Sequence, residues 1–192
     1  MRFISAVAIV WMAAACASLP ARQGTTSTSP ADSAVIHDDI AYLASDRLEG
    51  RLTGTPGNDS AAAYLARRYA GIGLKSASPG YLQKFSAHSA ADAHVGIMSG
   101  RPTQNVVAIF PGSDPRLAGE YIVIGAHFDH LGRDTQFALD PEAKDAIRNG
   151  ADDNASGTAA VLQLARMLKA AHPRRSVIFA NFSGEEEGLL GS

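Results

Sequence analysis

Residues 121–126 read Tyr-Ile-Val-Ile-Gly-Ala, and the polar sequence His-Phe-Asp-His follows them at once at residues 127–130. Two further apolar runs, Asn105 to Phe110 and Ser176 to Phe182, are bounded by turn residues or by polar motifs. Continuous apolar runs of this length are typical of strands that are buried on both faces of a sheet. We therefore predict three strands at these positions.

A long helix is predicted between the second and third of these strands. Val161, Leu164 and Leu168 recur at helical spacing and are expected to face the core, whereas Gln163 should face outward. A strand, a helix and a strand in this order predict an α/β fold, in which helices cover a largely parallel or mixed sheet.

Two shorter helices are predicted ahead of the strands. Apolar residues recur at helical spacing over residues 36–43, and a second helix begins near Pro56 and ends at Gly73. The stretch between them, Asp46 to Arg51, carries four charged side chains among its six residues and is predicted to be a charged loop.

The N-terminus has the pattern of an export signal. Residues 1–19 form a predicted signal peptide, in which Arg2 precedes an apolar segment too short to span a membrane comfortably. Cleavage at a small-x-small site and lipoprotein-type cleavage before Cys16 are both consistent with it. Residues 20–33 are rich in Ser, Thr and Pro and predict a linker, so the folded domain should span residues 34–192. We expect an exported protein, either periplasmic, an outer-membrane lipoprotein tethered through Cys16, or secreted.

Composition restricts the class of partner. Of the 192 residues, 46% are hydrophobic and 19% are charged, which is the balance of a globular domain. The formal net charge of -2 offers no basic surface for nucleic acid, so nucleic acid is excluded as a partner. Cys16 is the only cysteine, so the folded domain contains no disulfide.

A histidine and an aspartate stand at the end of the second predicted strand. His127 and Asp129 are two residues apart and point to the same side of an extended chain. His127 can offer one ring nitrogen to a metal ion while Asp129 accepts a hydrogen bond from the other. Taken alone, the pair is better explained as two polar groups that satisfy a strand end.

Two acidic motifs follow. Residues 149–157, Asn-Gly-Ala-Asp-Asp-Asn-Ala-Ser-Gly, open the long helix; capping needs one such residue rather than three, and a carboxylate can also bridge two metal ions. Glu185, Glu186 and Glu187 follow the third strand. They form either a solvated acidic turn or a metal ligand beside a general base. Together the three motifs supply the ligand chemistry of a zinc site.

In order and spacing these motifs resemble those of the two-zinc aminopeptidase family, which includes bacterial leucyl aminopeptidases and is related to glutamate carboxypeptidase II. The resemblance extends from about Ile36 to Ser192 and implies a three-layer α/β/α fold with a central mixed sheet. It implies a zinc-dependent exopeptidase of the aminopeptidase type, which hydrolyses peptides with water activated by two zinc ions.

The resemblance also implies a role for each matching residue. His127 would bind one zinc ion, Glu186 the other, and Asp153 would bridge the two. Asp129 would orient His127. Glu185 would be the general base.

Two features depart from the family pattern or match nothing in it. His130 and Asp152 correspond to no ligand, so we expect at most supporting roles for them. The family's two further ligands would lie beyond Ser192, which leaves each zinc ion with two protein ligands instead of three or four. We therefore expect the N-terminal part of a peptidase domain, inactive by itself. Carboxypeptidase activity, a glutaminyl cyclase of the same fold and a non-catalytic binding domain remain alternatives.

Overall fold

The computed structural model describes residues 31–88, 100–133 and 138–192. The predicted signal peptide, Cys16 and the linker up to residue 30 lie outside these residues. Within the described part, no helix has the length and apolar character needed to cross a membrane.

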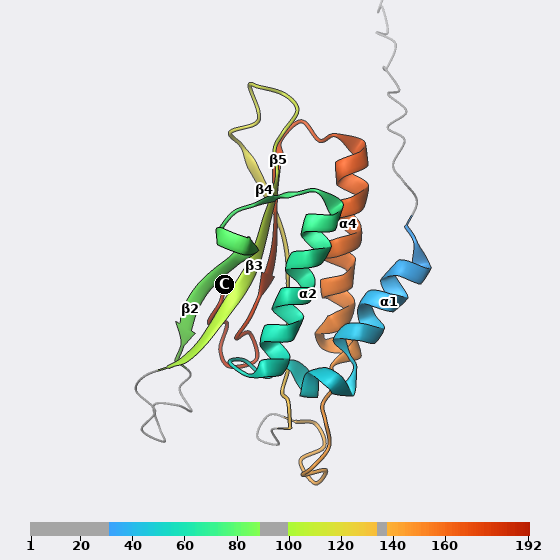
Figure 1. Ribbon diagram of the computed structural model, residues 1–192, viewed down its shortest axis with the longest axis vertical. Coiled ribbons are helices and arrows are strands. Elements are labelled where there is room, and N and C mark those ends of the chain that lie inside the picture. Colours follow the sequence, from blue (N-terminus) through green and yellow to red (C-terminus); the bar gives the residue numbers. More distant parts are fainter. Residues whose placement is uncertain (1–30, 89–99, 134–137) are drawn as a thin grey trace, which may run out of the picture.

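The described residues form one mixed sheet of five strands (Figure 1). Its strands are β1 (Lys75–Ser76), β2 (Leu82–Ala87), β3 (Arg101–Phe110), β4 (Tyr121–His127) and β5 (Ser176–Phe182). β3 pairs antiparallel with β1, β2 and β5, and β4 runs parallel to β5. The predicted α/β class and mixed sheet are confirmed. β1 and β2 were not predicted, because β1 has only two residues and β2 mixes apolar and polar residues without a continuous apolar run.

Three α-helices lie on one side of this sheet (Figure 1). They are α1 (Ser33–Leu43), α2 (Pro56–Ile72) and α4 (Gly157–Ala171). α2 and α4 contact the strands of the sheet, and α1 packs against α4. Short turns of helix lie at η1 (Asp46–Arg51), η2 (Pro79–Tyr81) and η3 (Ala151–Ser156). The two helices that were predicted ahead of the strands are present as α1 and α2. The side chain of Asp32 caps the N-terminus of α1, and that of Thr55 caps the N-terminus of α2. Among the described residues, the helices supply one of the two helical layers that a three-layer fold requires.

The core lies between the helices and the sheet. Leu65 and Tyr69 of α2 and Leu162 of α4 are fully buried there, together with Phe179 of β5. The Tyr69 hydroxyl donates to Asn181 Oδ1 at 2.5 Å, which satisfies a polar strand residue inside the core. The helices are therefore fixed to the strands by apolar packing and by the buried hydrogen bond between Tyr69 and Asn181.

The inward face of α4 differs from its predicted face. Val161 is buried as predicted, but Leu164 is 40% exposed and Gln163 is only 5% exposed. The buried stripe runs through Val161, Leu162 and Ala165, and Leu164 lies beside it. Gln163 is accommodated because its Oε1 accepts a hydrogen bond from Arg166 at 2.9 Å.

The prediction that the strand at residues 121–126 is buried on both faces was wrong. Tyr121, Ile122 and Val123 are 57%, 47% and 61% exposed. β4 is the edge strand of the described sheet, and the described helices cover only one of its faces. Its apolar side chains thus present an open sheet edge in the described part of the chain.

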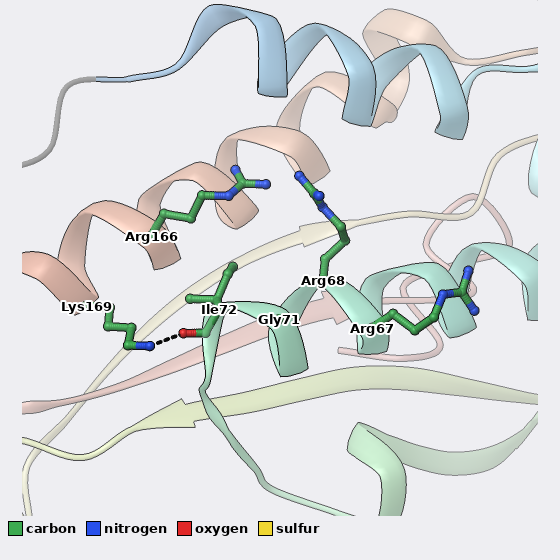
Figure 2. A pocket seen from close by; sticks show the side chains of 6 residues that line it. All are labelled: Arg67, Arg68, Gly71, Ile72, Arg166 and Lys169. Carbon is green, nitrogen blue, oxygen red and sulfur yellow. Dashed lines mark hydrogen bonds between the residues drawn. The ribbon is translucent and has the colours of Figure 1, made fainter.

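A basic pocket of about 460 Å³ opens between α2 and α4 (Figure 2). Asp39 of α1 is fully buried behind it and pairs with Arg68 at 2.8 Å and with Arg166 at 2.9 Å. Lys169 donates to the carbonyl of Ile72 at the end of α2. Three of the basic side chains therefore join three helices to one another. The pocket shares no residue with the motifs at residues 127–130, 149–157 and 185–187, which we call the strand-end motifs.

Candidate functional site

Two parallel strands bring the candidate residues to one edge of the sheet. β4 and β5 are in register with His127 opposite Phe182, so the segments that follow both strands leave the sheet side by side. The turn η3 joins them from the start of α4, at the same end of the molecule (Figure 1). Ligands of open α/β sheets bind at such carboxyl ends of strands.

Three side chains from these segments converge. His127 Nε2 lies 3.1 Å from Asp153 Oδ1. One ligand atom each from His127, Asp153 and Glu186 lies within 4.8 Å of the other two. An imidazole nitrogen and carboxylate oxygens are ligands that zinc accepts, so this donor set fits the metal that the resemblance implies.

Asp129 lies behind His127 and is fully buried. Its Oδ2 accepts hydrogen bonds from Thr53 Oγ1 at 3.1 Å and from the Glu186 amide at 3.4 Å. Its Oδ1 is 3.7 Å from His127 Nδ1 and has no hydrogen-bond partner in the described structure. A buried unsatisfied oxygen at this place is suited to accept the Nδ1–H of a histidine whose Nε2 binds a metal.

Thr53 was missed by the sequence analysis. It lies within a short polar stretch between two helices, and no local pattern links it to Asp129. Its contribution depends on the fold, which brings residue 53 against residue 129 in the interior.

Two residues of the acidic motif before α4, Asp153 and Asn154, have different contacts. Asn154 Oδ1 accepts from the Gly157 amide at 3.0 Å and so caps the helix. The Asp153 side chain is 64% exposed and remains available beside His127. Gly150 has a left-handed φ of 55°, and a side chain there would collide with the Asp153 backbone and the His130 ring. The turn thus projects Asp153 toward the site.

The three consecutive glutamates point to different partners. Glu185 Oε2 lies 3.8 Å from His127 Nε2. Glu186 Oε1 lies 2.6 Å from His130 Nδ1, and Glu187 pairs with Arg101. His130, for which at most a supporting role was expected, therefore contacts a candidate metal ligand.

The electrostatic field of the site acts on two titrating groups. Burial lowers the pKa of His127, but the carboxylates of Asp129, Glu185 and Asp153 outweigh it and raise this pKa to about 9. Burial also raises the pKa of Glu185, and the carboxylates of Glu186, Asp129 and Asp153 add to the rise while His127 opposes it.

These shifts predict the pH dependence of metal binding. With a pKa of about 9, His127 is protonated in the metal-free protein at neutral pH, and zinc must displace that proton. Zinc affinity of the full-length protein should therefore rise by about tenfold per pH unit between about pH 6 and 8. Competition with a chromophoric chelator across this range measures it. An affinity that does not change with pH would contradict the protonated state of His127.

Comparisons with known proteins show similarity to peptidases. Residues 105–192 match peptidase family M28. The chain is 30% identical over 145 residues to the alkaline phosphatase isozyme conversion protein of Escherichia coli. The aligned region covers 74% of this chain and 40% of that protein. It is 38% identical over 88 residues to a probable zinc metalloprotease of Pyrenophora teres, covering 45% of this chain and 17% of that protein.

Solved structures show the same fold. The glutaminyl cyclase of Fimbriiglobus ruber superimposes with a TM-score of 0.67 at 21% identity, covering 83% of this chain and 48% of that one. A Zn-dependent exopeptidase from Parabacteroides distasonis gives a TM-score of 0.65 at 21% identity, covering 84% and 49%. The predicted resemblance to zinc exopeptidases is confirmed. This chain spans less than half the length of each of these proteins.

Proposed function

We propose that the full-length protein is a zinc-dependent exopeptidase of the aminopeptidase type that acts on peptide substrates. The observation that carries the proposal is the convergence of His127, Asp153 and Glu186 at the ends of two parallel strands. The match of residues 105–192 to peptidase family M28 supports the same reaction class.

We propose that this cluster contributes to a site for two zinc ions. His127 would hold one ion, Glu186 the other, and the exposed carboxylate of Asp153 would be shared between them. When bound, zinc would polarise the scissile carbonyl and lower the pKa of water in the site. Asp129 would fix the ring of His127 through Nδ1, in the orientation that turns Nε2 to the site.

In this proposal Glu185 is the general base. Its side chain is 36% exposed, so water and substrate can reach it, and it lies beside His127 rather than in a separate ion pair. It would take a proton from the attacking water and return it to the leaving amine. Its raised pKa favours this role, because a base that must also release its proton works best with a pKa nearer the working pH.

Product analysis tests the function and separates it from its alternatives. The zinc-loaded full-length protein is incubated with a peptide that has a free N-terminus, its N-acetylated form, and a peptide that begins with glutamine. Mass spectrometry should show residues lost one at a time from free N-termini, including the glutamine, with the acetylated peptide intact. Shortening from the C-terminus would instead identify a carboxypeptidase, and unchanged peptides in the presence of bound zinc would identify a binding domain.

Glutaminyl cyclase is the second candidate, because a cyclase of this fold superimposes on the chain with a TM-score of 0.67. Loss of ammonia from the glutamine peptide, without loss of a residue, would establish this activity. We favour the peptidase because the family match covers the Asp153 and Glu185 motifs themselves.

A further inference from the structure

Arg51 is a fully buried arginine next to the site, in the stretch that was predicted to be a charged loop. Its guanidinium points inward and donates to main-chain carbonyls. Nε donates to Phe128 O at 2.7 Å, Nη1 to Asn149 O at 2.7 Å and Nη2 to Gly150 O at 3.1 Å. Nη1 also donates to the carbonyl of Leu43, at the end of α1.

These acceptors belong to the two segments that carry the candidate metal ligands. Phe128 lies between His127 and Asp129, and residues 149 and 150 form the turn that leads to Asp153. The Arg51 main chain adds to this link, since its carbonyl accepts from the His130 amide at 3.3 Å. One residue therefore bonds to the chain on both sides of the 3.1 Å gap between His127 and Asp153.

We propose that Arg51 is the positioning residue of the site, which sets the distance between the His127 segment and the Asp153 segment before metal binds. The inference rests on the proposed metal site and deepens it. Arg51 does not bind metal or substrate in this account. It acts by holding the backbone of the two segments in one arrangement.

The chemistry of arginine suits this task. A guanidinium presents five N–H donors in a rigid planar fork, so it can bond to several carbonyls that lie in different directions. Burial lowers the pKa of Arg51, but only to about 10, so the group stays charged at neutral pH and its hydrogen bonds are charge-assisted. A lysine has three donors on one flexible point and cannot span the same set of acceptors.

Zinc affinity of the Arg51→Lys variant is the principal test. The full-length variant keeps a buried cation, and we expect it to remain folded by circular dichroism while it binds zinc about 10- to 100-fold more weakly, the loss typical of outer-shell partners of metal ligands. Binding of Co²⁺ provides a second readout, because its visible absorption reports ligand geometry and should differ between variant and wild type.

Asp39→Asn is the matched control. It removes a buried charge from the helix layer, where Asp39 pairs with Arg68 and Arg166. Among the described residues, no hydrogen bond or ion pair joins Asp39 to the strand-end motifs. We expect a lower Tm with unchanged zinc affinity. Wild-type zinc affinity in Arg51→Lys would overturn the proposal, and so would equal losses of zinc affinity in both variants at equal loss of stability.

Hydrogen exchange on the metal-free wild type decides the question if Arg51→Lys does not fold. The His130 amide bonds to Arg51 O, and the Ala155 amide bonds to Gly150 O. If Arg51 joins the two segments, both amides should exchange with the same opening free energy; separate values would overturn the proposal. A wild-type protein that binds no zinc would refute the proposed function, and this exchange result would stand independently of it.

Discussion

Replacing Glu185 with glutamine in the full-length protein should lower kcat for peptide hydrolysis by about 10²- to 10⁴-fold. Glutamine keeps the shape of the side chain but cannot take up the proton of the attacking water. Because Glu185 is not among the three clustered metal-ligand candidates, the variant should retain zinc. Steady-state kinetics with metal analysis of the same sample measures both quantities.

Glu187→Gln is the matched control for this substitution. Glu187 is of the same chemical type and lies two residues away, but it pairs with Arg101 instead of facing His127. Its replacement should leave kcat near the wild-type value. Near-normal turnover in Glu185→Gln, or equal losses in the two variants, would show that Glu185 is not the base.

Replacing Asp153 with asparagine should have the second large effect. The substitution removes the carboxylate that our proposal shares between two zinc ions, and the amide that replaces it carries no charge to hold them. Zinc affinity should fall by more than the 10- to 100-fold typical of outer-shell residues, and hydrolysis should fall with it. Equilibrium dialysis with metal analysis measures the zinc bound per protein molecule.

Asp152→Asn is the control for that variant. Asp152 is the preceding residue, is exposed, and does not belong to the cluster formed by His127, Asp153 and Glu186. It should bind zinc as the wild type does. If both substitutions weaken zinc binding equally, the effect is one of general negative charge, and Asp153 is not a specific ligand.

The sequence predicted the fold best where the chain is regular. The apolar runs at residues 105–110, 121–126 and 176–182 lie in β3, β4 and β5. The exposure of β4 was not predicted, because an apolar run shows that a strand avoids water but not which neighbours cover it. The prediction that Leu164 faces the core was wrong for a related reason. Helical periodicity defines the buried stripe only to within about one residue to either side.

The sequence predicted which motifs meet at the candidate site, but not which side chains contact one another there. Strand ends of a parallel pair meet at one edge, so the motifs at His127 and Glu185 had to lie together. The contact of His130 with Glu186 and that of Thr53 with Asp129 depend on how distant segments pack. The burial of Arg51 was not predicted, because charge in a loop usually means exposure, whereas here the guanidinium donates to main-chain carbonyls.

Titration of zinc into the chelator-stripped full-length protein, with peptide hydrolysis followed at each addition, tests the central claim most directly. The stripped protein should be inactive, and activity should rise with added zinc and reach its plateau at two equivalents per chain. Hydrolysis that persists at full rate after zinc has been removed, or a stripped protein that takes up no zinc, would contradict the assignment of a zinc-dependent peptidase.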